Sequence, residues 1–323
     1  MSPRVVVVGS FMQDLAFYAR NFPAPGETVV GEFRPGPGGK GFNQAVAATR
    51  AGAATHFIGA VGRDAFGAGA KKFATKIGLR ATWIEKPKHP TGAALIAINS
   101  AGQNQIIISP GANLALHRRE VPADLLAGAD VVVCQGESDY RTVAHTLKLA
   151  RQIGAITVLN PAPMRADFDL ALLRHTEVLI PNESEFVALV RLHRDCHHLL
   201  REHAAFNEAS LHALKPEALQ RLCRCLGVPV VILTLGARGC FVSQTDGGHL
   251  IRAHPVEAID TTGAGDAFVG GFAAGLVRFK RDIRAAVEFA NTVAALAVMQ
   301  PGTAEAMPNT REIARFRRER AHA

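Results

Sequence analysis

The chain has 323 residues, 48% of them hydrophobic and 20% charged, and 36 Lys and Arg against 28 Asp and Glu give a net charge of +8. This is the composition of a globular protein and excludes a disordered chain. No apolar run reaches the ~18 residues of a membrane span, and the basic residues are scattered without interleaved aromatic ones, so we expect neither a membrane nor a nucleic-acid partner.

The five cysteines are an odd set without a CxxC pair, and the N-terminus shows no signal peptide. These features predict reduced thiols and a cytoplasmic location.

Short β-branched runs alternate with helical stretches, which is typical of a parallel sheet covered by helices. The predicted strands are residues 5–9, 55–60, 129–135, 156–159, 177–180 and 228–235, with a further strand end at 255–259. The predicted helices are residues 40–50, 66–77, 140–153, 263–277 and 283–299. The alternation predicts the α/β fold class.

Two early regions break this alternation. Residues 15–33 and 80–109 contain period-two segments with turns and no helix between them. We expect lid segments at about 12–36 and 80–110 to form a small antiparallel sheet on a single α/β domain spanning residues 1–323. Such a sheet can close over a site at the strand ends.

One segment, residues 187–226, is rich in His and Arg and holds three of the cysteines. Its spacing matches no metal-ligand pattern, so we expect a polar helical insertion, with a zinc site as the alternative.

A glycine-rich segment at residues 260–271, DTTGAGDAFVGG, precedes a predicted helix. Gly263, Ala264 and Gly265 let backbone N–H groups converge at the helix N-terminus, which predicts a phosphate pocket. Asp266 places a carboxylate beside that anion, where it can act as a base toward an attacking hydroxyl. The alternative is that Asp266 only caps the helix.

A second glycine cluster, GPGGKGFN at residues 36–43, also opens a helix, with Lys40 and Asn43 as donors. It is not a Walker A loop, because Gly41 follows Lys40 where Ser or Thr is required. It suits a neutral polyhydroxy ligand or a phosphate, and a plain glycine turn is the alternative.

Polar side chains follow several predicted strands. They are Asp14, Glu137, Asn182 and Glu185. Because the carboxyl ends of parallel strands share one edge of a sheet, we expect these side chains to line one cleft.

Several motifs, in this order and spacing, resemble the PfkB-type carbohydrate kinases and, within that family, the ribokinase branch. They are GSFMQD (9–14), PAPGETV (23–29), GGKGFNQAVAA (38–48), TGAALI (91–96), GANLAL (111–116), LNPAP (159–163), PNESE (181–185), TLGARG (234–239) and DTTGAGDAFVGGF (260–272). The resemblance implies a three-layer α/β/α sandwich with a central, mostly parallel sheet and a small β-sheet lid. It also implies transfer of the γ-phosphoryl of MgATP to the 5-hydroxyl of D-ribose.

The resemblance assigns roles to single residues. Asp266 corresponds to the catalytic base, and the amides of residues 263–266 correspond to the anion hole. With Asp266, the sugar-binding positions are Asp14, Gly39, Lys40, Asn43 and Glu137. The positions for ATP and Mg²⁺ are Asn182, Glu185, Thr234, Gly236, Gly265 and Asn291.

The resemblance also implies a K⁺ site next to the anion hole and a homodimer formed through the lid. The matching cation positions are Asp260, Thr262, Ala297 and Gly302, while Ala306 stands where the family has a serine. Another acceptor (a different pentose, a nucleoside or pseudouridine) and a catalytically silent sugar- or nucleotide-binding regulator are the alternatives. The departing Phe42 is expected to pack into the core.

Overall fold

The computed structural model describes residues 4–201 and 206–321 of the chain. Its centre is a nine-stranded sheet in the order β13-β12-β11-β10-β9-β8-β1-β4-β5. The strands are β1 (Val5–Val8), β4 (Thr55–Val61), β5 (Arg80–Glu85), β8 (Val131–Gln135), β9 (Ile156–Asn160), β10 (Val178–Leu179), β11 (Val230–Thr234), β12 (Cys240–Gln244) and β13 (Gly247–Ile251). All neighbours pair in parallel except β11 with β12 and β12 with β13.

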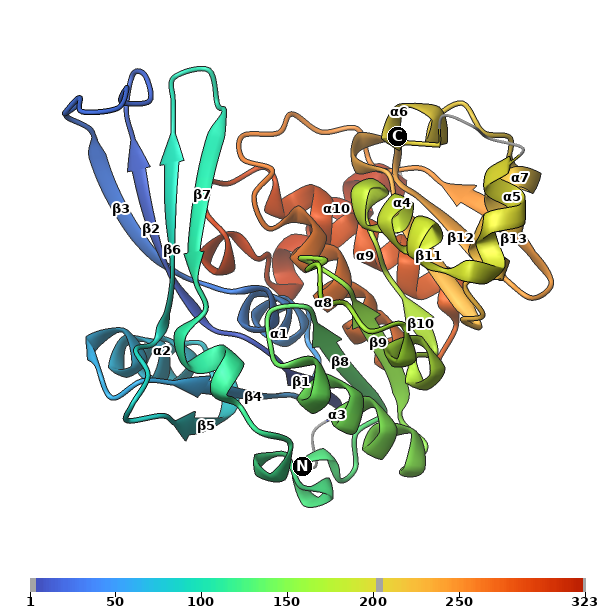
Figure 1. The fold of residues 1–323 in the computed structure, drawn as a ribbon, viewed down its shortest axis with the longest axis horizontal. Helices are drawn as coiled ribbons and strands as arrows, with labels where there is room; N and C mark the ends of the chain where they lie inside the picture. Colours follow the sequence, from blue (N-terminus) through green and yellow to red (C-terminus); the bar gives the residue numbers. More distant parts are fainter. Residues whose placement is uncertain (1–3, 202–205, 322–323) are drawn as a thin grey trace.

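Helices cover both faces of this sheet (Figure 1). The Val-rich strand β1 shows why: Val5 and Val7 pack into one core cluster and Val6 and Val8 into the other, as alternation along a strand requires. The first face carries α1 (Lys40–Arg50), α2 (Ala65–Lys76), α8 (Ala264–Arg278) and α9 (Ile283–Ala297). The second face carries α3 (Tyr140–Gln152), α4 (Glu183–Leu192) and α7 (Pro216–Cys225). The predicted α/β/α sandwich is confirmed.

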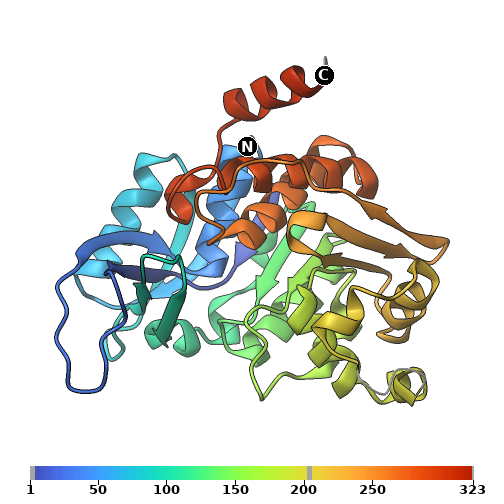
Figure 2. The same ribbon diagram turned by 90° about the horizontal axis from the view of Figure 1, so that it is seen from above.

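A separate four-stranded sheet, the lid sheet, has the order β3-β2-β6-β7. Its strands are β2 (Met12–Tyr18), β3 (Glu32–Gly38), β6 (Gly92–Ile98) and β7 (Asn104–Ser109). Figure 1 shows it extending beyond the layers, and Figure 2 places it at one end of the molecule, away from the C-terminal helix α10 (Thr310–Ala321).

The lid prediction needs two corrections. The sheet is mixed, because β2 pairs with β6 in parallel. Residues Arg80–Glu85 are not part of it, since β5 pairs in parallel with β4 and forms the edge of the main sheet. Its four inner residues are half-buried, and Trp83 and Ile84 pack against opposite core clusters of the main sheet.

Residues 187–226 are largely helical where the structure describes them, with α5 (His197–Arg201), α6 (Glu208–Leu211) and α7. The prediction of reduced thiols is wrong for two cysteines, because Cys196 and Cys225 form a disulfide. The remaining Cys134, Cys223 and Cys240 are free and buried. Among the described residues no group of three or more His, Cys, Asp or Glu is arranged to hold a metal.

Of two further expectations from the sequence, one is wrong and one is confirmed. Residues 255–259 contain no strand, and the chain reaches α8 from β13 through an irregular segment. Phe42, by contrast, is fully buried and packs edge-on against Phe11 and Phe57, so the expectation that it belongs to the core is confirmed. No described helix is long and apolar enough to cross a membrane.

Candidate active site

The carboxylate of Asp266 lies in the first turn of α8 and is buried. Both of its oxygens accept hydrogen bonds from side chains of α1: Oδ2 from Asn43 Nδ2 at 3.0 Å and Oδ1 from Gln44 Nε2 at 2.9 Å. The Asp266 side chain makes no N-cap bond to the backbone, because the N-cap residue is Gly263. The capping alternative for Asp266 is therefore wrong, and the carboxylate is instead fixed from outside its own helix.

A buried amide network stands behind this contact. Gln44 Nε2 also donates to Asn160 Oδ1 at 3.0 Å, and Gln44 Oε1 accepts from Gln135 Nε2 at 2.7 Å. Gln135 and Asn160 end the neighbouring strands β8 and β9. Sequence reasoning assigned no role to Gln44 or Gln135, whose only signal was their position beside predicted site residues.

The glycine cluster before α1 is required by close packing. Gly39 is the N-cap of α1 with φ +87°, and a Cβ there would lie 2.6 Å from the backbone nitrogen of Met12. At Gly38 a Cβ would lie within 2.4 Å of all three carboxyl atoms of Asp14. The turn therefore brings the backbone against the end of β1 and the start of β2, as predicted for a close approach to a ligand site.

Glu137 follows β8 and is buried against that same turn. Its Oε2 accepts a short hydrogen bond from Ser10 Oγ and another, of 2.8 Å, from the backbone N–H of Lys40. Burial raises the pKa of Glu137, an effect that the Lys40 charge and these hydrogen bonds only partly oppose. Ser10 is a further site residue that sequence reasoning missed.

Lys40 supplies a positive charge to this cluster of acidic side chains. Burial of its ammonium group favours the neutral form, but the carboxylates of Asp266, Glu137 and Glu185 outweigh that effect and raise the pKa of Lys40. Lys40 therefore stays charged among three acidic groups, of which Glu137 and Glu185 were expected to lie together.

Asp14, on β2 of the lid sheet, also faces this cluster. Its Oδ2 lies 3.0 Å from the hydroxyl of Thr303, which can donate to it. Burial, opposed by the Thr303 contact and reinforced by the charges of Glu137 and Asp266, raises the pKa of Asp14 from 3.8 to about 7. The sequence carried no signal for Thr303, which lies 289 positions away.

The N-terminus of α8 is the predicted anion site. Gly263 adopts φ +79°, which turns the chain into the helix. The Ala264 N–H is bonded to Thr261 O, whereas the N–H groups of Gly265 and Asp266 have no hydrogen-bond acceptor within the described residues. Two donors beside the Asp266 carboxylate are thus free to hold an anion.

Asn182 and Glu185 form a capping box at the start of α4. Asn182 Oδ1 accepts from the Glu185 N–H at 2.9 Å, and Glu185 Oε2 accepts from the Asn182 N–H at 3.0 Å. Burial raises the pKa of Glu185, and it lies close enough to Lys40 and Asp266 to interact with both charges. These two residues therefore adjoin the cluster while their side chains also cap a helix.

The remaining predicted nucleotide positions lie beyond α4. The Thr234 hydroxyl at the end of β11 lies 3.2 Å from Pro181 O, and Gly236 (φ +54°) begins a short helical turn. Asn291, buried on α9, donates to Arg252 O at 3.3 Å. No contact joins these three residues to one another within the described chain, so the structure does not group them as it groups the residues around Asp266.

Two of the predicted cation positions, Thr262 and Gly302, are hydrogen-bonded to a third, Asp260. Its Oδ1 accepts from the Thr262 N–H at 2.9 Å and its Oδ2 from the Gly302 N–H at 3.0 Å. The carboxylate therefore joins the loop before α8 to the loop after α9. Helix α9 ends at Ala297, so this second loop begins directly after it. Ala306 lies further along that second loop and is buried.

Arg165 holds the loop that carries Glu137. Its Nη1 donates to Gly136 O at 2.9 Å and Ser138 O at 3.0 Å, the carbonyls on either side of Glu137. The guanidinium lies 4.0 Å from the ring centre of Tyr140 and pairs with Asp167. Arg165 is thus a positioning residue, and sequence reasoning missed it.

We expect Arg165→Ala to raise KM for the sugar acceptor that the motifs predict about tenfold, with kcat changed less than about threefold, because two hydrogen bonds from a charged donor fix the Glu137 loop. Steady-state kinetics give this split. Arg151→Ala, which removes a comparable bond from an exposed arginine to Arg174 O, is the control. Equal losses in both variants, or a fall in kcat alone, would contradict the positioning role.

The family of the chain follows from comparison with known proteins. Residues 2–310 match the model of the pfkB family carbohydrate kinases. The chain is 34% identical to a Mus musculus ribokinase, covering 96% of this chain and 93% of the relative, and 32% identical to a Salmonella typhi deoxyribokinase, covering 94% and 95%. An Arabidopsis thaliana ribokinase complexed with ribose and ATP superposes with a TM-score of 0.83 at 28% identity, covering 98% and 99%.

These matches run through the main sheet and the lid sheet alike, because they cover nearly the whole chain. The chain belongs to the pfkB family of carbohydrate kinases. The class predicted from its motifs, a sugar kinase, is therefore confirmed.

Proposed function

We propose that the protein transfers the γ-phosphoryl group of MgATP to the 5-hydroxyl of D-ribose, with Asp266 as general base. One observation carries this proposal: the Asp266 carboxylate is held by Asn43 and Gln44 directly beside two unbonded N–H groups at the N-terminus of α8. A base and an anion-binding site in the same helical turn suit the attack of a hydroxyl on a phosphoryl group.

The acceptor pocket suits a molecule with several hydroxyl groups. Asp14 and Glu137 offer carboxylate oxygens, and Asn43 Oδ1 is buried without a hydrogen-bond partner. A buried acceptor without a donor is unfavourable unless a ligand supplies one. Sugar hydroxyls would satisfy these groups, while Lys40 and the Gly39 backbone border the same space.

In the reaction, Asp266 takes the proton as the sugar hydroxyl attacks the γ-phosphorus atom, and the bond from that phosphorus to the leaving oxygen of ADP breaks. The amides of residues 263–266, mainly those of Gly265 and Asp266, stabilise the charge on the transferred phosphoryl group. Lys40, whose ammonium group remains charged, adds to this stabilisation. Alignment is the main contribution of the protein, because phosphoryl transfer has a loose transition state.

The nucleotide is proposed to bind across Asn182, Glu185, Thr234, Gly236, Gly265 and Asn291. Mg²⁺ keeps most of its water and phosphate ligands and needs only one or two carboxylates, so the buried Glu185 at the edge of the cluster fits such an ion. When bound, Mg²⁺ neutralises charge on the phosphates.

A K⁺ ion is proposed to bind between the two loops joined by Asp260. The Asp260 carboxylate supplies negative charge between these loops, where it accepts from the N–H groups of Thr262 and Gly302, and the Ala297 carbonyl belongs to the second segment. The loss of the family serine at Ala306 removes one ligand.

We expect turnover to rise when K⁺ replaces choline, and Asp260→Asn to raise the K⁺ concentration for half-activation about tenfold, because one negative charge near the cation is lost. Kinetics over a K⁺ series measure this. Asp282→Asn, at the N-cap of α9, is the control. Activation unaffected by Asp260→Asn would contradict the proposed cation site.

The test of the proposed function is ADP release from MgATP with ribose, 2-deoxyribose, fructose, adenosine and pseudouridine. We expect ribose to give the highest kcat/KM. A preference for 2-deoxyribose would make that sugar the acceptor in place of ribose. The similarity to a deoxyribokinase makes 2-deoxyribose the second candidate. Turnover with none of the five would favour a silent binding protein and contradict the proposal.

The lid is proposed to form a homodimer. Phe17, Phe33, Leu95 and Ile107 lie on one face of the lid sheet, because β2, β3, β6 and β7 are in register at alternate positions. All four are exposed, and Ile107 on the edge strand β7 is 70% accessible. Apolar faces and open edges of this kind favour pairing with a second copy.

We expect the wild-type chain to run as a dimer in light scattering coupled to size exclusion, and Leu95→Glu with Ile107→Glu to run as a monomer, because two buried charges would be unpaired. Leu250→Glu, on the exposed hairpin strand β13, is the control and should leave the dimer intact. A wild-type monomer would exclude the lid interface.

A further inference from the structure

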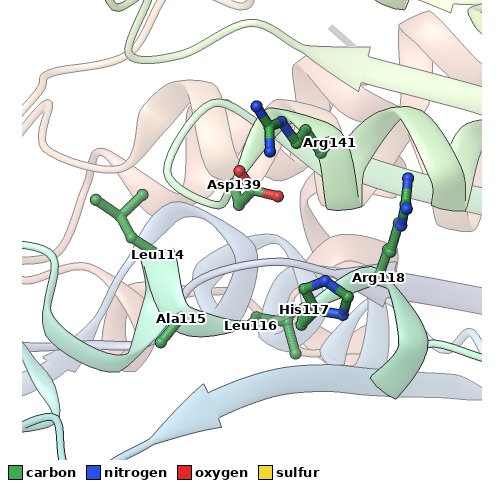
Figure 3. Close-up of a pocket in the computed structure, with 7 residues that line it drawn as sticks. All are labelled: Leu114, Ala115, Leu116, His117, Arg118, Asp139 and Arg141. Carbon is green, nitrogen blue, oxygen red and sulfur yellow. The ribbon is translucent and has the colours of Figure 1, made fainter.

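A pocket outside the site described above lies between residues 114–118 and the start of α3 (Figure 3). Its lining residues are Leu114, Ala115, Leu116, His117, Arg118, Asp139 and Arg141. The volume of about 450 Å³ falls in the range of small-molecule sites. None of these residues takes part in the proposed phosphoryl transfer.

Positive charge dominates the rim of this pocket. Figure 3 shows Arg118 and Arg141 standing apart across it, with His117 beside Arg118 and Asp139 beside Arg141. Neither arginine side chain has a hydrogen bond or ion pair with any described residue. Two free guanidinium groups facing one cavity suit a phosphate, which each can bind through paired N–H donors.

The surroundings add to this positive potential. Burial first, and then the charges of Arg118 and Lys148, lower the pKa of the nearby His145, so the ammonium group of Lys148 lies in the same region as Arg118 and adds its positive charge there. Lys148 does not line the pocket itself, and neither does Arg119. An anionic ligand would therefore be attracted before it contacts the lining residues.

Asp139 narrows the chemistry of the ligand. Its Oδ2 accepts from the N–H of Thr142 at 3.0 Å and lies 3.1 Å from the Thr142 hydroxyl, while its Oδ1 has no donor among the described residues. The Asp139 carboxylate would repel inorganic phosphate, because both are negatively charged. A phosphorylated sugar could instead donate a hydroxyl hydrogen bond to Asp139 and place its C–H groups against Leu114.

The two segments that line the pocket also contact the residues proposed to bind the acceptor. Asn113, next to Leu114, accepts from the Phe11 N–H at 3.0 Å and donates to Phe11 O at 2.8 Å. The opposite wall begins two residues after Glu137, and the Thr142 hydroxyl joins the walls by donating to Leu116 O at 2.8 Å. A ligand that bridges Arg118 and Arg141 would therefore act on both segments that position the Ser10–Glu137 pair.

We propose that this pocket binds a phosphorylated sugar, with its phosphate between Arg118 and Arg141 and a hydroxyl on Asp139, and that its occupancy changes acceptor affinity. The binding part does not depend on which acceptor the kinase uses. The coupling to acceptor affinity rests on the proposed function, since it is read from KM.

The test is calorimetric titration of glucose 6-phosphate, ribose 5-phosphate and inorganic phosphate into the full chain, with and without saturating ribose. Three proteins are compared: wild type, Arg118→Ala with Arg141→Ala, and the control Arg119→Ala with Lys148→Ala. Both pairs remove two positive charges from the same region. KM for ribose is then measured in each protein with and without glucose 6-phosphate.

We expect one saturable site for the sugar phosphates that ribose does not block, with affinity at least about tenfold lower in the Arg118/Arg141 variant and within about twofold in the control. The effect of glucose 6-phosphate on KM for ribose should disappear in the Arg118/Arg141 variant and persist in the wild type and the control. Equal weakening in both variants, or binding blocked by ribose, would overturn the site. Inorganic phosphate binding as tightly as the sugar phosphates would overturn the role of Asp139. Binding in an enzyme inactive on ribose would support the site while contradicting the proposed acceptor.

Discussion

Replacing Asp266 by Asn is expected to lower kcat by about 10² to 10⁴ while leaving acceptor and nucleotide affinity within about threefold, because the amide cannot take the hydroxyl proton. The substitution keeps the size of the side chain, which matters at a buried position. It does leave one contact mismatched, since Asn43 and Gln44 both donate to the carboxylate and the Asn amide offers one acceptor only.

Single-turnover measurement with enzyme in excess separates the chemical step from product release, and calorimetry gives the affinities. Glu288→Gln, on the exposed face of α9, removes the same kind of charge away from the cleft and should be silent. A turnover of Asp266→Asn within tenfold of the wild type would exclude Asp266 as the general base. A large loss of acceptor affinity would indicate that the mismatched amide has disturbed Asn43 and that the kinetic effect is structural.

The fold and the sugar-kinase class were predictable because both depend on local patterns. Buried Val-rich runs predict strands covered on both faces, and β1 behaves in this way. The glycine-rich segments predict close backbone approach and a helix N-terminus, and Gly39 and Gly263 adopt the positive φ values that such turns need. Each of these features is written within a few neighbouring residues.

What the sequence could not predict is mainly pairing between distant segments. Gln44 looks like one polar residue in a helix, and its role emerges only when α1 packs beside α8 and the ends of β8 and β9. The assignment of Arg80–Glu85 to the lid failed for the same reason, because its pairing with β4 joins two segments that are separate in the sequence. The Cys196–Cys225 disulfide joins residues 29 positions apart within a segment that has no recognisable cysteine spacing.

The charged groups around Asp266 suit ligand binding but lower the stability of the protein without ligands. Glu137, Glu185 and Asp266 lie around the ammonium of Lys40, and Asp14 adds a fourth acidic group beside Glu137 and Asp266. Burial raises the pKa of Asp14, Glu137 and Glu185, so part of the negative charge is unfavourable in the protein without ligands. Acceptor hydroxyls that donate to these carboxylates would relieve that cost, which couples ligand binding to stability.

Asp14 allows this cost to be measured. Its pKa is about 7 in the folded chain and 3.8 as the reference value, so the folded state binds more protons between these values. The stability contribution of Asp14 is therefore present below pH 3.8 and is lost as the pH rises to about 7. At pH 8 we expect Asp14→Asn to raise the free energy of unfolding by about 2 kcal/mol. The full difference between the two pKa values would correspond to ~4 kcal/mol, and partial exposure of Asp14 to solvent reduces it.

The same substitution should weaken acceptor binding, because a carboxylate accepts hydroxyl hydrogen bonds more strongly than an amide. We expect KM for ribose to rise roughly 30-fold in Asp14→Asn, from the loss of about 2 kcal/mol. In the wild type, KM should fall as the pH rises from 6 to 8 and Asp14 ionises, while the variant should show a flat profile over that range.

Urea unfolding at pH 5 and pH 8, together with KM measured across the pH range, tests both effects on one pair of proteins. Thr303→Val is the matched variant: it removes the hydroxyl that contacts Asp14 and leaves the carboxylate in place, so the pH dependence of KM should persist and move to higher pH. A variant Asp14→Asn that is less stable than the wild type at pH 8, or that retains the KM profile, would show that Asp14 is not the group whose ionisation controls acceptor binding.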